Sequence, residues 1–457
     1  MFTRDIYIAR RQKLKETIKS GVLLFLGNEL SAMNYVDNTY TFRQDSTFLY
    51  YFGIDQEGLV AIIDLDEEKE IIFGDELSID HIVWMGNLPT LKERADQVGA
   101  ETRPSGSLAE ALKGRKVHYL PPYRPEHQMK LANWLGKSLN EVDSGVSEEM
   151  IIAIGEQRLI KGVEEIEQME EAASITADMH LAAMRYAKPG MTEAQVAAKV
   201  REVALADGND VSFPIIATIN GQTLHNHYHG NTISEGDLFL LDTGASNKMH
   251  YAGDMTRTFP VGPKFSEQQK DVYTIVLEAF YNSLNILKPG INYKEAHFAA
   301  CETIFEGLKS LGITKGDTGE AVANGAHALF MPHGVGHLLG LDVHDMENFG
   351  EEYIGYAGEK KSSQFGLKSL RLGRMLKPGF AVTIEPGIYF IPELIDLWQA
   401  ESKHGEFINY AKLADYRSFG GIRIEEDAVV TDSSYKVLGK PLAKTIQEVE
   451  MERAKAF

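Results

Sequence analysis

Two pairs of helical segments, each interrupted by the same Lys-Pro-Gly triplet, constrain the fold of this chain more than any other feature. In the first pair, apolar residues at steps of three and four predict a long amphipathic helix that begins near residue 158 and ends at the triplet 188–190. Thr192 to Gln195 then forms a capping box that opens a second helix. The stripe comprises Ile166, Met169, Ala173, Ala177, Leu181 and Met184.

The same order recurs downstream. A helical pattern over 267–287 stops at the triplet 288–290 and resumes over 293–308. Each helix pair leads into a strand-like, histidine-rich segment, 213–229 after the first and 329–344 after the second. Lys-Pro-Gly alone is a common helix stop. Its ordered context favours an internal duplication, whose simplest form is a pseudo-twofold with a site between the halves.

The first third of the chain has a different pattern. Short apolar runs at 23–26, 59–63 and 70–73 read as strands among helical stretches. We therefore expect an α/β (α+β) fold in two parts, a small α/β domain over residues 1–158 and a duplicated domain over residues 159–457.

Composition excludes several classes of protein. The 457 residues carry a net charge of -20 and no local basic patch, which disfavours nucleic acid as a partner. The charged start lacks the apolar centre of a signal peptide, and no stretch of about 18 apolar residues predicts a membrane span. The single cysteine, Cys301, excludes an intramolecular disulfide framework. These features predict a cytoplasmic protein.

Residues that can bind metal ions or transfer protons are concentrated in the second domain, where nine of the fourteen histidines lie between His225 and His344. Four carboxylates there adjoin apolar strand-like runs: Asp242, Asp254, Glu385 and Glu425. His337 lies in the glycine-rich segment His-Gly-Val-Gly-His. A carboxylate on a buried strand needs a partner, either a basic side chain or a metal ion.

Taken singly, each of these residues has a structural interpretation, for example a turn cap for Asp242 or an ion pair with Arg371 or Arg423 for Glu385. Together, four carboxylates and one histidine make a hard, oxygen-rich ligand set. Such a set suits two ions of Mn, Fe, Co or Zn about 3.5–4 Å apart, which lower the pKa of a water molecule and polarise a carbonyl. The chemistry indicated is hydrolysis.

The segments FMPHGVGHLLGLDVHD, VTIEPGIYF and GGIRIEED closely resemble the pita-bread metallopeptidases, the family of methionine aminopeptidase, aminopeptidase P, prolidase and creatinase. TFRQDSTFLYYFGI and VWMGNL in the first domain resemble the amino-terminal domain of aminopeptidase P and prolidase. The resemblance covers nearly the whole chain. It implies that Asp242 binds one metal ion, that Asp254 and Glu425 bridge two ions, and that His337 and Glu385 complete the second, with Glu385 moving the proton of the water.

The resemblance also implies accessory histidines that contact the substrate and stabilise the transition state: His333, His344 and one histidine near 225. The family usually shows Leu-His-Tyr, whereas this chain reads Leu-His-Asn-His-Tyr-His over 224–229. His225 is favoured because it follows leucine, and His227, before tyrosine, is the alternative. The interval from the first aspartate ligand to the second is one residue longer than usual, which predicts an enlarged turn or a bulge.

The first-domain resemblance implies cleavage of Xaa-Pro bonds. The segment GLKSLR, which ends at Arg371, resembles the prolidase arginine that pairs with the free carboxylate of a dipeptide. The stretch 391–418 also resembles prolidases, and Arg423 is a further expected substrate contact. In contrast, YAGDMTRTFPV at 251–261 and the segment 312–317 equally resemble aminopeptidase P, which acts on longer peptides. The balance favours a proline dipeptidase.

The same residues allow two other interpretations. Leu-Asp-Thr-Gly-Ala at 241–245 matches the aspartic-protease signature, but that mechanism needs a second copy. A catalytically inactive peptide-binding module of the same fold is the other alternative. Hard ligands favour manganese, with cobalt, iron or zinc as alternatives. The resemblance further implies a homodimer in which Trp84 reaches a neighbouring site, although a tryptophan of this kind also suits a core.

Overall fold

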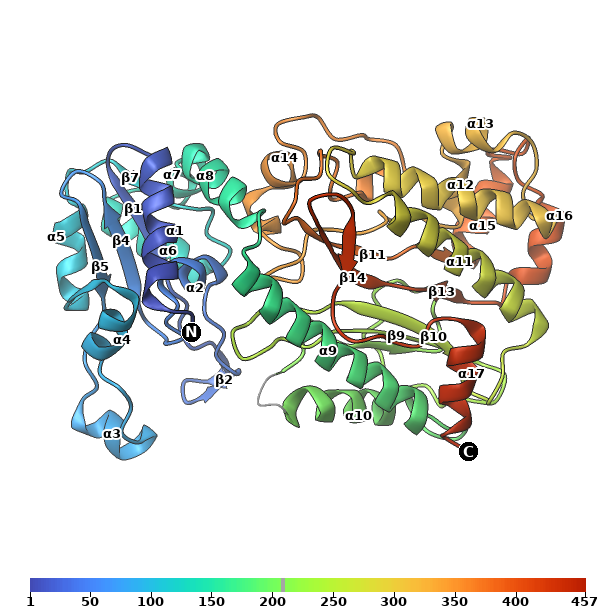
Figure 1. Cartoon of the computed structure of the whole chain (residues 1–457), viewed down its shortest axis with the longest axis horizontal. Coiled ribbons are helices and arrows are strands. Elements are labelled where there is room, and N and C mark those ends of the chain that lie inside the picture. The colour runs from blue at the N-terminus through green and yellow to red at the C-terminus, as the bar shows by residue number, and fades with distance from the viewer. Residues whose placement is uncertain (207–209) are drawn as a thin grey trace. The chain divides into compact units, whose positions relative to one another are not determined.

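The computed structural model describes residues 1–206 and 210–457 and divides the chain into two compact units (Figure 1). The first unit consists of Met1–Arg158 and Asn348–Ile354, and the second of Leu159–Glu347 and Gly355–Phe457. In the part of the chain that is described, no helix combines the length and the apolar character that crossing a membrane requires.

The short segment Asn348–Ile354 interrupts the continuous second domain expected over 159–457. Its side chains Phe349 and Ile354 are buried. Ile354 packs so closely on Gly155 that any side chain at that glycine would collide with it. Apolar packing of this kind, which leaves no local signal in the sequence, assigns the segment to the first unit.

The first unit is built on a five-stranded sheet of order β6-β5-β4-β1-β7, with β1, β4 and β5 antiparallel and the two outer pairings parallel. Its three longest strands match the three expected apolar runs. The strands are β1 (Val22–Leu26), β4 (Val60–Asp64), β5 (Lys69–Phe73), β6 (Glu101–Arg103) and β7 (Val117–His118), with a separate pair β2 (Ala32–Tyr35) and β3 (Asn38–Thr39). The helices are α1 (Arg4–Thr17), α2 (Ser46–Phe52), α3 (Ile79–Met85), α4 (Leu91–Val98), α5 (Leu108–Leu112), α6 (Pro125–Leu135), α7 (Leu139–Ser144), α8 (Glu148–Arg158) and α14 (Glu351–Ile354).

The second unit contains both expected helix pairs, and each pair packs on strands of its own half (Figure 1). The first half consists of α9 (Val163–Tyr186), α10 (Glu193–Ala206) and the antiparallel strands β8 (Ile216–Thr218), β9 (Leu238–Thr243) and β10 (Met255–Pro260). The second consists of α11 (Glu267–Ile286), α12 (Lys294–Ser310), α13 (Thr318–Ala323), η2 (Ala326–Leu329), β11 (Ala381–Ile384), β12 (Gly387–Tyr389), α15 (Pro392–Ala400), α16 (Tyr410–Leu413), β13 (Gly421–Arg423), β14 (Glu426–Val430), β15 (Tyr435–Val437) and α17 (Ile446–Ala454).

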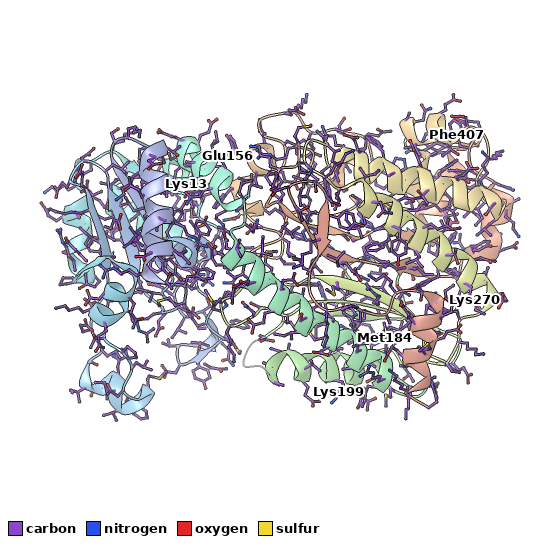
Figure 2. The ribbon with its side chains drawn as sticks, in the orientation of Figure 1. Lys13, Glu156, Met184, Lys199, Lys270 and Phe407 are labelled. Carbon is purple, nitrogen blue, oxygen red and sulfur yellow. The ribbon has the colours of Figure 1, made fainter. Side chains whose placement is uncertain are left out.

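Helix ends follow the local sequence. Thr192 and Gln195 form the expected capping box, in which the Gln195 N–H donates to the Thr192 hydroxyl and the Thr192 N–H donates to the Gln195 side chain. Met184 of α9 is fully buried, whereas Lys199 of α10 and Lys270 of α11 are partly exposed (Figure 2). The apolar stripe of each helix therefore faces its own half of the unit.

The two Lys-Pro-Gly turns have equivalent structures. Gly190 and Gly290 have φ angles of 88° and 84°, a region in which a side chain is disfavoured. The N–H of Gly190 donates to the carbonyl of Ile233, and that of Gly290 donates to the carbonyl of Leu376, both at 2.9 Å. In each half, the glycine of the turn therefore hydrogen-bonds a residue that lies five residues before a strand, β9 in the first half and β11 in the second. Equivalent contacts of this kind agree with an internal duplication.

Candidate active site

Asp242 and Asp254 come from the β9–β10 hairpin. Asp242 pairs across the strands with Thr256, and Asp254 lies two residues before Thr256, the spacing that places side chains on one face. Between them Asn247 closes a turn, because its side-chain oxygen accepts hydrogen bonds from the N–H groups of Met249 and Tyr251. The hairpin therefore presents both carboxylates toward one cavity.

His337 and Glu385 are brought together by backbone pairing. The N–H of Glu385 donates to the Val335 carbonyl at 2.8 Å, and the His337 N–H donates to the Thr383 hydroxyl at 3.1 Å. Gly336, between Val335 and His337, passes so close to Thr383 that any side chain would collide with its carbonyl. The glycine is what lets the histidine segment lie against β11.

Glu425 follows β13 and is fastened to the other half of the unit. Its N–H donates to the Thr256 carbonyl at 3.1 Å, and its Oε2 accepts a 2.6 Å hydrogen bond from the Thr256 hydroxyl. Two residues later, Asp427 accepts a 3.0 Å hydrogen bond from the N–H of Asp254. These contacts carry the second-half carboxylate to the first-half hairpin.

The result is a tight cluster of acidic groups around one imidazole. Ligand atoms of Asp254, His337 and Glu425 all lie within 4.8 Å of one another. His337 Nε2 is 3.3 Å from Asp254 Oδ2 and 3.8 Å from Glu385 Oε1. His337 Nδ1 lies 3.0 Å from the Leu338 carbonyl, which can only accept, so Nδ1 carries the proton and the Nε2 lone pair faces the carboxylates.

The electrostatics of this cluster fit bound cations. Burial, together with the neighbouring carboxylates, raises the pKa of both Asp254 and Glu425 well above the usual range. Among the described residues, Oδ1 of Asp242 and Oδ1 of Asp254 have no hydrogen-bond partner although both are buried. Buried carboxylate oxygens without partners are costly. Divalent cations would satisfy these oxygens and allow the carboxylates to be ionised together.

The site opens into a cavity of about 430 Å³. All the residues expected from the sequence to hold metal or substrate line it: His225, Asp242, Asp254, His333, His337, His344, Arg371, Glu385, Arg423 and Glu425. His227, the alternative to His225, lines it as well. Burial lowers the pKa of His225, with the guanidinium of Arg423 as the next contribution.

A tyrosine that sequence reasoning did not single out joins two of the expected residues. The Tyr389 hydroxyl accepts a 2.8 Å hydrogen bond from Arg423 Nη1 and donates to His333 Nε2 at 2.9 Å. His333 Nδ1 donates to the Gly334 carbonyl at 2.7 Å, and burial lowers the pKa of His333 to about 3, which fixes a neutral ring. Tyr389 lies on β12, four residues after Glu385. Because side chains alternate between the two faces of a strand, this even spacing was the one sign in the sequence that Tyr389 could share a face with Glu385.

Arg423 also reaches Asp242, donating from Nη2 to Oδ2 at 2.6 Å. One oxygen of Asp242 is thereby engaged, while Oδ1 remains available. An aspartic protease needs a second aspartate that shares a proton with the first, whereas Oδ2 of Asp242 faces the guanidinium of Arg423. The aspartic-protease interpretation of the segment 241–245 has no support here.

Glu347 is the second residue that sequence reasoning missed. His344 Nδ1 lies 2.5 Å from Glu347 Oε2, and Arg371 forms an ion pair with the other oxygen of the same carboxylate. The hydrogen bond from His344 is the main cause that lowers the pKa of Glu347 to about 2. Glu347 is therefore ionised, and it holds the histidine and the arginine on one side of the cavity. Only the three-residue spacing from His344 was visible in the sequence.

Comparison with known proteins agrees with this geometry. Residues 167–432, more than half of the chain, match the family described as metallopeptidase family M24. The chain belongs to metallopeptidase family M24. Residues 7–118 match the aminopeptidase P N-terminal domain, so this M24 protein has the two-part architecture expected from its sequence.

Relatives of this M24 chain carry two activities. It is 31% identical to the Xaa-Pro dipeptidase of Homo sapiens over 97% of this chain and 92% of that protein. It is 30% identical to the Xaa-Pro aminopeptidase of Escherichia coli (strain K12) over 98% and 97% of the two chains. The M24 protein is thus an Xaa-Pro peptidase, and the relatives do not distinguish dipeptidase from aminopeptidase.

Solved structures show the same fold. Aminopeptidase PepP of Pseudomonas aeruginosa superimposes with a TM-score of 0.83 at 28% identity, covering 100% of this chain and 99% of that one. Zinc-substituted E. coli aminopeptidase P in complex with product gives a TM-score of 0.82 with the same identity and coverage. Membership of M24 implies a dinuclear site for divalent metal ions, and the acidic cluster fits that requirement.

Proposed function

We propose that this M24 peptidase is a dinuclear-metal-dependent proline dipeptidase, a prolidase. An Xaa-Pro aminopeptidase that accepts longer peptides is the alternative. The observation that carries the proposal is that Arg371, a cation suited to a free carboxylate, lines the same cavity as the acidic cluster of Asp254, His337 and Glu425.

The proposed ligands of the two ions are Asp242, Asp254, His337, Glu385 and Glu425. In this assignment Asp242 would be a ligand of one ion, His337 and Glu385 would be ligands of the second, and Asp254 and Glu425 would be ligands of both. The unpartnered oxygens of both aspartates and the outward lone pair of His337 support it. Four carboxylates form a hard donor set, which favours manganese over cobalt, iron or zinc.

When bound, the ions would polarise the scissile carbonyl and lower the pKa of a water molecule. Glu385 is the proposed acid and base. Its carboxylate lines the cavity with Oε1 3.8 Å from His337 Nε2, so it could reach a water molecule held beside the cluster. It would accept the proton of the attacking water and deliver it to the leaving nitrogen. Arg423 holds Asp242 in place throughout.

Three histidines are proposed to contact the substrate. His225, His333 and His344 line the cavity, and His225 is preferred to His227 because it follows leucine, as the corresponding family histidine does. Burial lowers the pKa of His344 to about 4, so it is a neutral donor or acceptor at neutral pH. Such groups stabilise charge that develops on the scissile carbonyl.

Dipeptidase specificity is proposed to rest on Arg371, with Arg423 as a further substrate contact. In the structure Arg371 is paired with Glu347, so a substrate carboxylate would share or displace that partner. A dipeptide places its free carboxylate one residue beyond the scissile bond, within the reach of an arginine that lines the same cavity. A longer peptide has a neutral amide there and gains nothing from the guanidinium.

The deciding experiment compares rates for Xaa-Pro and Xaa-Pro-Xaa peptides with manganese added. We expect kcat/KM for the dipeptide to exceed that for the tripeptide by at least about tenfold, the factor that corresponds to about 1.4 kcal/mol. Faster cleavage of the tripeptide would establish the aminopeptidase alternative. No cleavage of either peptide by protein that holds two equivalents of metal would support an inactive binding module instead.

A homodimer is also proposed. Helix α3 buries none of its residues and exposes four apolar side chains, Ile79, Val83, Trp84 and Met85, with Trp84 84% exposed. An exposed apolar cluster of this kind is typical of an interaction surface. Light scattering that finds a monomer at micromolar concentration would reject the dimer. The single cysteine, Cys301, is free and buried, which supports the proposed cytoplasmic location.

A further inference from the structure

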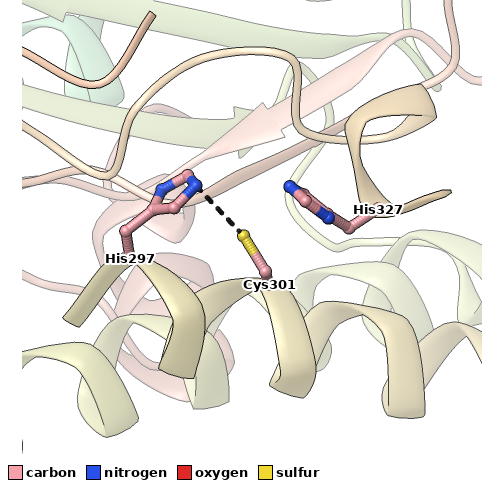
Figure 3. A group of neighbouring side chains, drawn as sticks. All are labelled: His297, Cys301 and His327. Carbon is pink, nitrogen blue, oxygen red and sulfur yellow. Dashed lines mark hydrogen bonds between the residues drawn. The ribbon is translucent and has the colours of Figure 1, made fainter. Parts of the chain in front are cut away.

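A second group of metal-ligating side chains lies outside the acidic cluster. His297 and Cys301 are four residues apart on α12, and His327 approaches them from η2 (Figure 3). His297 Nε2 is 3.4 Å from Cys301 Sγ. One ring nitrogen from each histidine and the cysteine sulfur all lie within 4.8 Å of one another. The thiol stands between the two imidazole rings in Figure 3.

The three side chains are buried, with no exposed surface, yet their polar atoms are poorly satisfied. Among the described residues, both ring nitrogens of His327 and Nδ1 of His297 lack a hydrogen bond of good geometry, although the backbone of Val322 acts on the ring of His327. Most buried polar side-chain atoms have at least one partner, so poorly satisfied nitrogens gathered in one place are consistent with a bound ligand. None of these residues lines the cavity of the acidic cluster.

We propose that His297, Cys301 and His327 bind one thiophilic metal ion, Cu(I) or Zn²⁺, separate from the dinuclear pair. One thiolate and two imidazoles are donors that select these ions over manganese. The cluster of carboxylates favours the harder manganese ion, so the two sites would differ in the hardness of their ligands.

Charge and protonation are consistent with this assignment. Burial lowers the pKa of His297 to about 3 and that of His327 to about 4, so both rings are neutral and offer a lone pair. Burial raises the pKa of the Cys301 thiol, so the thiolate forms only when a cation replaces its proton. Binding would release that proton to solvent and leave no net charge with Cu(I), or one positive charge with Zn²⁺.

The position of the ion gives it a structural role. Residues 330–333 continue directly from η2 and carry His333, whose ring lies in the active-site cavity. A bond from His327 to α12 would fasten the start of that segment. We therefore expect the ion to raise the melting temperature of the protein, because it binds the folded arrangement of the three ligands.

The experiment uses the reduced, full-length protein with Co²⁺ as the probe. The chain has a single cysteine, so any thiolate-to-cobalt charge-transfer absorption must arise at Cys301, whatever binds to the carboxylates. We expect this absorption to saturate at one thiolate-bound equivalent per chain. It should be lost in Cys301→Ser and in His327→Ala. Asp254→Ala, which removes a proposed ligand of the dinuclear pair, should retain it.

His118→Ala removes another buried histidine, from the first unit, and controls for a general loss of stability; its absorption should equal that of the unaltered protein. Titration with Cu(I) under anaerobic conditions and, separately, with Zn²⁺ identifies the preferred ion by which displaces cobalt at the lower concentration. The proposal is overturned if the unaltered protein shows no thiolate band, if His327→Ala keeps the full band, or if neither ion displaces cobalt. The unaltered protein decides the first point even where a variant fails to fold.

Discussion

The hydroxyl of Thr256 donates a 2.6 Å hydrogen bond to Oε2 of Glu425, across 169 residues of sequence. The bond joins a strand of the first half to a carboxylate of the second. It also uses one carboxylate oxygen of Glu425 and so fixes how the other is presented to the cavity.

Thr256→Val keeps the shape of the side chain and removes this bond, together with the 3.1 Å hydrogen bond that the Thr256 hydroxyl accepts from Nε of Arg423. Because groups that orient metal ligands typically contribute 10- to 100-fold in affinity or activity, we expect metal affinity to fall by roughly that factor. Isothermal titration with Mn²⁺ measures it. Thr314→Val is the matched control, since its buried hydroxyl donates to the Phe305 carbonyl away from the cluster. An equal loss of affinity in both variants would contradict the orienting role.

Asp254→Ala and Glu425→Ala should each abolish peptidase activity and lower the metal content. Each change removes a carboxylate proposed to lie between the two ions. Elemental analysis after gel filtration measures the content, and circular dichroism confirms the fold. Full occupancy by two ions in either variant would show that the ligand assignment is wrong.

His333→Ala should reduce turnover strongly while the metal content stays near that of the unaltered protein. The ring hydrogen-bonds Gly334 and Tyr389 rather than the acidic groups, so its removal leaves the proposed ligands intact. Tyr389→Phe should give a smaller loss, because the His333 ring stays in the cavity although the bonds from the Tyr389 hydroxyl to His333 and to Arg423 are lost. Rates and metal content measured on the same samples test both statements. Loss of metal from His333→Ala would mean that His333 and His337 have exchanged roles.

Arg371→Ala should slow cleavage of Xaa-Pro dipeptides more than cleavage of Xaa-Pro-Xaa tripeptides. The guanidinium is proposed to bind the carboxylate that only the dipeptide has next to proline. Glu347→Gln is the companion variant, because it removes the negative charge that pairs with Arg371 and keeps the arginine itself. We expect it to lower KM for the dipeptide. Equal losses on the two substrates in Arg371→Ala would remove the reason for preferring a dipeptidase.

Lys161→Met should destabilise the second unit by about 3–5 kcal/mol, because it removes a buried cation that pairs with the buried carboxylate of Asp345. The two side chains pair at 2.9 Å and each is only 1% exposed. Lys270→Met, which breaks an exposed pair with Glu267, should change stability by about 0–1 kcal/mol. Urea unfolding of both variants gives the comparison. Similar small changes in the two would mean that burial adds nothing to the Lys161 pair.

Much of the architecture could be predicted from local sequence. The capping box at Thr192, the stop at Gly290 and the strand that ends before Glu385 are governed by neighbouring residues, so periodicity and turn chemistry predict them. The residues expected to hold metal and substrate also line one cavity. Each of them adjoins a strand or a glycine turn, and the order of these elements is similar in the two halves of the second unit.

The parts that escaped prediction depend on distant partners. The hydroxyl of Tyr389 is positioned by a hydrogen bond from Arg423, 34 residues further along the chain, and no local sequence pattern predicts that contact. In the sequence, Glu347 is indistinguishable from a surface glutamate, and its role becomes visible only through its ion pair with Arg371. The histidine and cysteine of α12 are readable as one helical face, but the approach of His327 is a matter of tertiary packing.

The hydrogen bonds that link Thr256 to Glu425 have a further consequence for how the protein is made. The proposed ligands span residue 242 to residue 425, so the hairpin aspartates are synthesised long before the carboxylate that completes their cluster. A growing chain that has exposed only the first half cannot hold the metal pair. With the proposed ligands, hydrolytic capacity would therefore be acquired only after residue 425 has been synthesised and has folded against the hairpin.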